Sequence, residues 1–401
     1  MQNVTSCRFE ARYDPVDYIS TYIYLLALPS VCIIGSCAAI LCIIVFTKKQ
    51  MRSSLNVYLA GLSFFDLLLL SFSALIFTPL QGCVLQGHDN TAVCKFFWKS
   101  TPYTLPISNV AQTCSVWTCV AVTVDRFLAV NYPLHSKIWC TPRKAVCILT
   151  IITIMSFVFK APMFFELTTD DCGVLSTTWL RDSYVYKQYY VMYGYLIFIV
   201  LVPWAMMIFL NLFVVIAVHK AYKIRRSMQQ GGKKNQEERD RRCTLMAIAM
   251  VLTFLVFNVV AAVNNIAESF QMNIGYWGPI GNLLVCLNSA SNIVIYSLFG
   301  ARFRQMCVIM LCGKRSKCMS WMKVGRSLSE WDHRDGTTRK TSLDASTSLL
   351  FSRASHRWSK RSHAYQHSGS LPGGRRDTLI MESVHNKVSI QTLSPNMQFT
   401  N

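Results

Sequence analysis

Charge is the property that this sequence most clearly lacks. Only 15% of its 401 residues are Asp, Glu, Lys or Arg, whereas a soluble domain carries about 25%. We also find no internal repeats, no cluster of metal ligands, no glycine-rich phosphate loop and no nucleophile triad. These absences argue against an enzyme and, with a hydrophobic share of 52%, they predict a chain that folds within a bilayer.

Long apolar runs account for the hydrophobic excess. A helix needs about 20 apolar residues to cross the hydrocarbon core, and seven runs are long enough. Because backbone groups inside lipid must be hydrogen-bonded within their own segment, we expect helices rather than strands. The sequence therefore predicts an all-α membrane protein, a seven-transmembrane helix bundle. The predicted spans are Tyr22–Phe46, Val57–Leu80, Tyr103–Val130, Ala145–Phe165, Tyr190–Val218, Thr244–Ala267 and Trp277–Phe299.

Acidic residues are also scarce, 20 against 40 Lys and Arg, and the resulting net charge of +20 could suggest a nucleic-acid partner. The placement of the charge argues against nucleic acid. Nine basic and three acidic residues lie between Val218 and Thr244, and fifteen and six follow Leu311, whereas acids are in excess between the fourth and fifth spans. Since basic loops stay in the cytoplasm, we expect a plasma-membrane protein with its N-terminus outside and its tail inside.

The spans divide the chain into three parts. We expect residues 1–18 to form an extracellular arm without a cleavable signal peptide, because they are polar and the first span is full length. Residues 19–311 should form the helix bundle, which ends in a short amphipathic helix over residues 302–311. Residues 312–401 are rich in Ser, Thr, Arg and Gly and should form a disordered cytoplasmic tail.

Short motifs suggest covalent modifications at both ends. Asn3 begins an Asn-Val-Thr glycosylation triplet on the predicted outer side. Cys312 and Cys318 follow the last helix closely enough to be palmitoylated. Disulfides persist outside the cell, and the four cysteines predicted there allow three pairings. These four are Cys7, Cys83, Cys94 and Cys172.

Asp66 lies in the middle of the second span, where a carboxylate is expensive and needs partners. Ser115 in the third span and Asn288, Ser289 and Asn292 in the seventh are candidates. A carboxylate with hydroxyl and amide oxygens would suit a small hard cation such as sodium, the one cofactor that we consider. The alternative is a protonated or hydrogen-bonded Asp66 that only packs helices.

Asp125 and Arg126 form a second charged group, at the cytoplasmic end of the third span. They could be an interface pair whose side chains reach toward the headgroups. They could also be a latch in which Arg126 pairs with Asp125 and, across the bundle, with Asp240 at the start of the sixth span. Breaking such a pair would bias a helix movement between two states.

These motifs together resemble the rhodopsin-like G-protein-coupled receptors over residues 19 to about 311. The run from Asn56 to Asp66 resembles the family's span-two motif, and Asp125-Arg126-Phe127 resembles its Asp-Arg-Tyr. Pro203 is similar to the span-five proline, and the run from Asn292 to Tyr296 is similar to Asn-Pro-x-x-Tyr. The strings 112–130, 160–166 and 288–292 are further similar to invertebrate FMRFamide and myosuppressin-type neuropeptide receptors.

The sequence departs from the family at several positions. Ala38 or Ala39 replaces the span-one asparagine, so Asp66 loses one usual partner, and the span-four tryptophan is absent. Val260 and Ile293 replace the prolines of spans six and seven, so the usual kinks there are in doubt. The resemblance implies a disulfide between Cys94 and Cys172, but Cys94 lies further from Arg126 than is usual, and Cys83 is a rival partner.

The resemblance implies a receptor for an extracellular neuropeptide, an amidated FMRFamide-like peptide, that activates a heterotrimeric G protein and is no enzyme. A receptor kinase and arrestin would act on the Ser- and Thr-rich tail. Tyr296 would join the switch with Asp125, Arg126 and Asp240. The peptide's cation would need a carboxylate and its amide would need polar partners. The implied ligand-binding residues are Asn109, Gln112, Glu166, Asn258, Asn265 and Glu268.

Other interpretations remain open at this point. The loop acids could be solvated surface, and the asparagines could hold helices together. The chain could be a divergent seven-helix receptor for another ligand. A transporter would usually have paired repeats with broken helices, and a channel a filter loop; the sequence has neither pattern.

Overall fold

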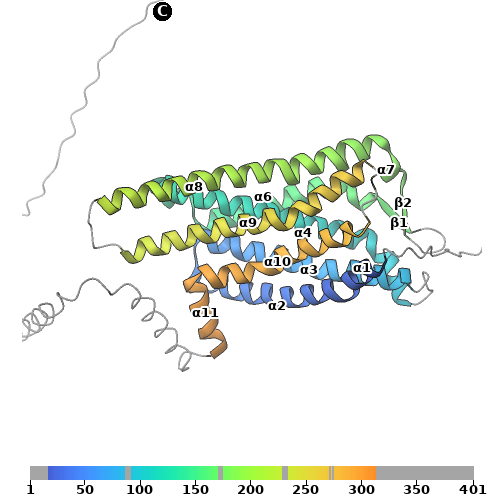
Figure 1. The fold of residues 1–401 in the computed structure, drawn as a ribbon, viewed down its shortest axis with the longest axis horizontal. Coiled ribbons are helices and arrows are strands. Elements are labelled where there is room, and N and C mark those ends of the chain that lie inside the picture. The colour runs from blue at the N-terminus through green and yellow to red at the C-terminus, as the bar shows by residue number, and fades with distance from the viewer. Residues whose placement is uncertain are drawn as a thin grey trace, which may run out of the picture. The chain divides into compact units, whose positions relative to one another are not determined.

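Seven long apolar helices run side by side in the computed structural model, which describes residues 17–85, 92–169, 175–227, 234–270, 272 and 275–312 (Figure 1). Each is long and apolar enough to cross a bilayer, which confirms the predicted fold. The spans within the described residues are Tyr18–Phe46, Ser54–Cys83, Ala92–Asn131, Pro142–Phe165, Tyr186–Lys220, Thr244–Ala267 and Trp277–Phe299.

Some spans are single α-helices, and others consist of two or three consecutive helical segments, some of them π-helical or 3₁₀. The elements of the spans are α1 (Asp17–Tyr22), a π-helical turn (Ile23–Ala27), α2 (Leu28–Phe46), α3 (Ser54–Leu85), α4 (Ala92–Asn131), α6 (Pro142–Lys160), a 3₁₀ turn (Ala161–Phe165), two π-helical segments (Tyr186–Gly194 and Leu196–Leu201), α8 (Val202–Ser227), α9 (Lys234–Ser269) and α10 (Trp277–Phe299). The connecting elements are a 3₁₀ turn (Lys49–Met51), α5 (Pro133–Trp139), β1 (Leu167–Thr169), β2 (Leu175–Thr177), α7 (Trp179–Asp182) and α11 (Ala301–Cys312).

The short elements gather at the two ends of the bundle. Strands β1 and β2 pair as an antiparallel hairpin, with Leu167 opposite Thr177 and Thr169 opposite Leu175. Figure 1 shows this hairpin and α7 at the end of the bundle opposite α11. The helix after the last span was predicted, whereas the hairpin was not. Three-residue strands leave a signal too short to separate from loop by period.

Helix α4 begins at Ala92, eleven residues before the predicted start of the third span at Tyr103. Its first turns carry the exposed residues Lys95 and Lys99, so the apolar run does not include them. Within this extension Cys94 forms a disulfide with Cys83 near the end of α3, with a Cα–Cα distance of 5.8 Å. The implied bond between Cys94 and Cys172 is therefore wrong, because a cysteine forms only one disulfide and Cys83 occupies Cys94.

This disulfide lies in a small apolar cluster at the hairpin end. Phe97 and Trp98 are buried beside Cys83 and Cys94, and Leu175 of β2 packs against them. The rings of Phe97 and Trp98 lie 4.8 Å apart between centroids. The cluster joins α3, α4 and the hairpin, so the rim of the bundle is built mainly around the extension of α4.

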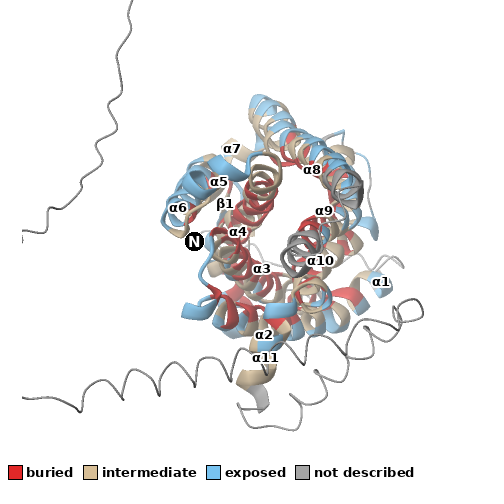
Figure 2. Ribbon diagram, turned by 90° about the vertical axis from the view of Figure 1, so that its left-hand side faces the viewer, coloured by how far each residue is buried: buried red, intermediate tan, exposed pale blue. Residues whose placement is uncertain are grey.

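Buried residues lie on the helix faces that turn toward the inside of the bundle (Figure 2). The helix α6 is the most exposed of the spans, and its buried residues are Ala145, Ser156 and Lys160. Ser156 and Lys160 are four residues apart, which places them on one face of the helix. The helices approach closely at Gly35 of α2, where an added Cβ would lie 2.8 Å from the Cβ of Ala290.

The sixth and seventh spans are continuous helices across the positions where the family prolines are missing. Val260 lies inside α9 and Ile293 lies inside α10. Proline does remain in the fifth span, where Pro203 follows the π-helical segment Leu196–Leu201. A proline removes one helical hydrogen bond, and a π-helical turn can accommodate that change.

Candidate functional site

Three asparagines predicted to bind ligand share one arrangement. The side-chain amide of each donates to the carbonyl four residues earlier in its own helix: Asn109 to Leu105 at 3.0 Å, Asn258 to Phe254 at 2.9 Å and Asn265 to Ala261 at 2.8 Å. The amide oxygens of Asn109 and Asn258 accept no hydrogen bond from the described residues. Each can therefore accept one from a ligand N–H group.

The asparagines of α4 and α9 lie at a similar depth in the bundle. Ala111 of α4 and Ala261 of α9 are buried in one apolar cluster with Leu69 and Val285. Gln112 follows Ala111 and is half-buried. This cluster connects α4 and α9 through buried side chains at the level of these predicted residues.

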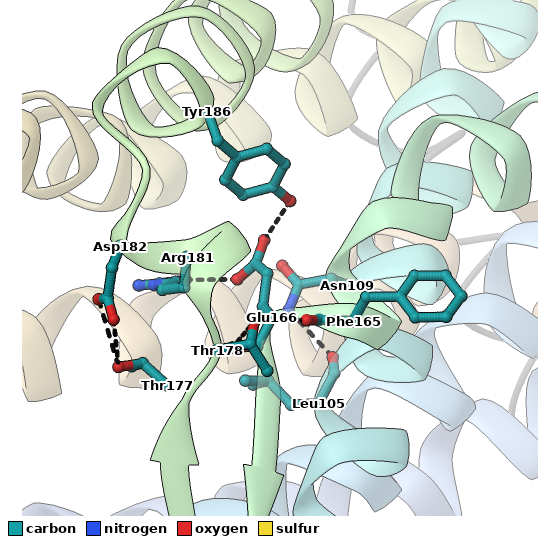
Figure 3. A network of polar contacts seen from close by, with 9 residues as sticks. All are labelled: Leu105, Asn109, Phe165, Glu166, Thr177, Thr178, Arg181, Asp182 and Tyr186. Carbon is teal, nitrogen blue, oxygen red and sulfur yellow. Dashed lines mark hydrogen bonds and ion pairs between the residues drawn. The ribbon is translucent and has the colours of Figure 1, made fainter.

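Glu166 is a predicted ligand-binding residue whose carboxylate is bound by other side chains of the protein (Figure 3). It follows the 3₁₀ turn after α6, and its side chain is 2% exposed. Arg181 donates from Nη1 to one carboxylate oxygen at 2.5 Å, and the Tyr186 hydroxyl donates to the other at 2.6 Å. A buried carboxylate needs such partners, so the protein itself already binds both oxygens that a ligand cation would approach.

The backbone around Glu166 is held by Thr178. Its N–H donates to the carbonyl of Glu166 at 3.0 Å, and its hydroxyl donates to the carbonyl of Phe165 at 2.6 Å. One turn later, Asp182 accepts from the Thr177 hydroxyl at 3.2 Å. These contacts connect the end of the fourth span to β2 and α7, and they fix the position from which Arg181 reaches Glu166 (Figure 3).

Asp66 lies at the centre of a polar network between three helices and is 1% exposed. The hydroxyls of Ser115 and Ser289 each donate to Oδ1 at 2.9 Å, and Asn292 donates to Oδ2 at 2.7 Å. Ser115, Ser289 and Asn292 are three of the four candidate partners. The fourth candidate, Asn288, forms no hydrogen bond to Asp66 in the described part of the chain, and its backbone carbonyl accepts from Ser291. One carboxylate and two hydroxyl oxygens are ligand types that fit a sodium ion.

The inner end of the third span contains an ion pair between the neighbours Asp125 and Arg126. Asp125 is buried, and its backbone carbonyl lies near the thiol of Cys140. Burial, followed by the negative charge of Asp125, raises the pKa of the Cys140 thiol to about 11. The Nε of Arg126 is buried and makes no hydrogen bond within the described residues.

Tyr296, the remaining switch residue, is fully buried beneath aromatic rings. It packs edge-on against Phe46 and Phe303, with centroid distances of 5.1 and 5.8 Å. Its hydroxyl makes no hydrogen bond within the part of the chain that the structure describes. The interaction of α2, α10 and α11 therefore depends on packing around this ring.

Several predicted positions lie outside the described residues. They are Asn3, Cys172 and Cys318, and the side chains of Asp240, Glu268 and Cys312. The proposed pairing of Arg126 with Asp240 stays a prediction for this reason. The same holds for the extracellular arm, for the disordered tail and for the modifications at Asn3, Cys312 and Cys318.

Three residues around Glu166 were not among the predicted site residues. Arg181 and Tyr186 bind its carboxylate, and Lys160 is buried six residues before it. Arg181 and Tyr186 lie fifteen and twenty residues from Glu166, so only the fold brings them together. Lys160 could have been found, because a lysine inside a predicted span is itself a signal of function.

Sequence comparison gives two results at the level of the family. Residues 38–296 match the family described as 7 transmembrane receptor (rhodopsin family). The chain is also 32% identical over 306 residues to the FMRFamide peptide receptor frpr-18 of Caenorhabditis elegans, a match that covers 71% of this chain and 69% of the relative.

Two other relatives have lower identity to this chain. The FMRFamide receptor of Drosophila melanogaster is 28% identical over 293 residues, which cover 71% of this chain but only 52% of that protein. The somatostatin receptor type 2 of Mus musculus is 24% identical over 313 residues, which cover 76% of this chain and 80% of that relative.

Proposed function

Since this chain belongs to the rhodopsin family of seven-transmembrane receptors, we propose that it binds an extracellular amidated peptide of the FMRFamide type and activates a heterotrimeric G protein. The identity of 32% with an FMRFamide peptide receptor carries this proposal. The polar groups on α4 and α9 support it, because a peptide amide needs such acceptors. The family is one of receptors and not of enzymes.

The direction of signalling follows from the charge on the loops. From the excess of basic residues in the third inner loop and in the tail, we infer that these segments lie in the cytoplasm and that the hairpin end faces the outside. In this orientation the proposed peptide enters between α4 and α9, beside Asn109 and Asn258. The free amide oxygens of these residues would accept hydrogen bonds from the peptide's terminal amide.

The peptide's other two groups have separate candidates. Phe254 is buried one turn below Asn258 and offers an apolar floor for a phenyl ring. An arginine of the peptide needs a carboxylate, and Glu268 remains the candidate. Glu166 is a weaker one than the sequence suggested, because Arg181 and Tyr186 occupy both of its oxygens.

The G protein would meet the opposite end of the bundle. Leu134 of α5 is 78% exposed there and can insert into a partner's apolar pocket. Arg126, with its buried and unbonded Nε, would change partners when the helices move. Phosphorylation of the tail would recruit arrestin, and palmitoylation of Cys312 and Cys318 would attach the tail to the membrane.

Nucleotide exchange on a G protein tests the proposal directly. Membranes from cells that express the receptor would be treated with synthetic Phe-Met-Arg-Phe-amide and with a panel of other amidated peptides. We expect guanine-nucleotide exchange to rise with at least one Arg-Phe-amide peptide and not with the same peptide on untransfected membranes. Exchange that responds only to unrelated ligands, or peptide-evoked ion current without exchange, would contradict it.

Two substitutions separate a ligand contact from a structural ion pair. We expect Glu268→Gln to weaken potency by about 10-fold or more at unchanged surface expression, because one charged hydrogen bond is lost. We expect Glu166→Gln to lower the melting temperature and surface expression instead. The amide is uncharged and keeps only one acceptor oxygen, so Arg181 loses its ion pair and one of the two donors, Arg181 or Tyr186, faces an NH2 group. Lys187→Gln, at an exposed charged residue in the same region, is the matched control.

A further inference from the structure

Lys160 lies inside the bundle, and no acidic side chain among the described residues bonds to it. Lys160 ends α6 and is 7% exposed, on the face of the helix that also buries Ser156. Its neighbours Phe157 and Val158 are exposed, so the lipid-facing side of α6 is a different one. Lys160 forms no ion pair within 4 Å and no hydrogen bond in the described part of the chain.

Aromatic rings surround the ammonium group instead of a carboxylate. The Nζ of Lys160 lies 5.4 Å from the ring centroid of Phe159 and 5.9 Å from that of Tyr195. Cation–π contacts attract an ammonium but do not replace the hydration that burial removes. The position therefore holds a cation in surroundings suited to receive an anionic partner.

Glu166, the described acid whose charge acts on Lys160, is already engaged. Glu166 acts on Lys160 electrostatically, but its two carboxylate oxygens accept from Arg181 and Tyr186. Glu166 can thus stabilise the positive charge of Lys160 electrostatically without forming a hydrogen bond or an ion pair with it. Because Lys160 faces the inside of the bundle, an anion that reaches it must come between the helices and not from the surrounding lipid.

We propose that Lys160 is a specificity residue that binds a carboxylate of the peptide ligand. The proposal rests on the proposed function, since it assumes a peptide that enters from the hairpin end. A charge-assisted hydrogen bond would form between Nζ and the carboxylate, while the rings of Phe159 and Tyr195 exclude water from it. The receptor would then select for an acidic group as well as for the terminal amide.

Matched peptides test the proposal and separate the two sources of a carboxylate. One set carries Asp or Asn one, two or three residues before Phe-Met-Arg-Phe-amide. A second pair compares Phe-Met-Arg-Phe-amide with the same peptide ending in a free carboxylate. At one of the three positions we expect the Asp peptide to be about 10- to 100-fold more potent than its Asn match in nucleotide exchange, the range for a charged hydrogen bond, whereas the free-acid peptide should be less potent than the amide. Equal potency of Asp and Asn at all three positions would overturn the proposal.

Receptor variants test whether this preference depends on Lys160. We expect Lys160→Met to abolish the preference for the Asp peptide and Lys160→Arg to retain it. Lys187→Met, at an exposed lysine of the same end, should leave it unchanged. A preference that survives Lys160→Met would also overturn the proposal.

A measurement without peptide checks the premise independently. Because an unpaired buried cation destabilises the folded state, the purified ligand-free Lys160→Met receptor should melt at a higher temperature than the wild type. A lower melting temperature would mean that the protein already neutralises Lys160, and it would overturn the inference. If no peptide in the panel evokes exchange, the proposed function fails, whereas this measurement still decides on the charge of Lys160.

Discussion

Among the described residues, the side chains that bond to Asp66 come from α4 and α10, although a rhodopsin-family receptor usually supplies an asparagine from the first span. Ser115, Ser289 and Asn292 supply three donors, enough to satisfy a buried carboxylate. Ala38 and Ala39 at the first-span position contribute none. The loss of that asparagine is thus compensated locally, and the network keeps the oxygen ligands that a cation would need.

Sodium should stabilise the receptor through this network. In a thermal unfolding assay, replacing choline chloride by sodium chloride should raise the melting temperature of the wild type. A sodium concentration ten times the dissociation constant would add about 1.4 kcal/mol of stability. Asp66→Asn should abolish the response, because an amide gives the ion no charge. Asp182→Asn should respond like the wild type, and a sodium effect that persists in Asp66→Asn would argue against this site.

The sequence predicted residues of this network better than those around Glu166. Asp66, Ser115 and Asn292 stand in motifs with fixed spacing on long helices, so their faces follow from the helical period. Arg181 and Tyr186 reach Glu166 through a loop, a hairpin and a short helix, whose path no periodicity specifies. Asn288 and Ser289 were both candidates, and they differ by one residue, about 100° around α10; the sequence did not decide between them, and the structure places Ser289 on Asp66.

At the scale of elements, the helices were predicted accurately where apolar residues continue to their ends. Helix α10 has the predicted bounds Trp277–Phe299. Helix α4 was placed too short, because Lys95 and Lys99 interrupt the apolar pattern although the backbone stays helical. The disulfide between Cys83 and Cys94 follows from this extension, which carries Cys94 next to the end of α3.

Close helix packing should make Gly35 sensitive to substitution. An added Cβ would lie 2.8 Å from Leu70 Cδ1 as well as from Ala290 Cβ, so α2, α3 or α10 must shift. We expect Gly35→Ala to cost about 1–3 kcal/mol, seen as a lower melting temperature. Gly82→Ala is the control, because nothing lies within 4 Å of its added Cβ. Equal melting temperatures for the two variants would contradict the close approach.

The disulfide should stabilise the outer rim. Cys83→Ser, Cys94→Ser and the double variant should lose the same stability, about 2–4 kcal/mol for a loop of this size, because each breaks the same bond. Reduction should lower the melting temperature of the wild type by more than that of any of the three variants, because only the wild type has this bond to lose. Different losses for the two single variants would indicate that one cysteine has another partner.

At the scale of the whole molecule, the orientation in the membrane is open to a direct test. Lys99 and Lys187 are exposed at the hairpin end, and Lys48 and Lys137 are exposed at the other. In intact cells we expect a membrane-impermeant amine reagent to label Lys99 and Lys187, detected by mass spectrometry, and Lys48 and Lys137 only after permeabilisation. Labelling of Lys48 without permeabilisation would reverse the topology, and with it the proposed direction of signalling.

Because α9 is one continuous helix, a movement at one of its ends can be transmitted to the other. Its 36 residues span about 54 Å, and Ala261 lies close to Gly281 of α10, where an added Cβ would be 3.5 Å from the Ala261 Cα. With valine in place of the hinge proline, a tilt of α9 would turn the whole helix as one rigid unit about this contact. The inner arm, from Lys234, is about three times as long as the outer one, which ends at Ser269. A displacement of a few tenths of an ångström at the outer end would thus reach the inner end amplified about threefold.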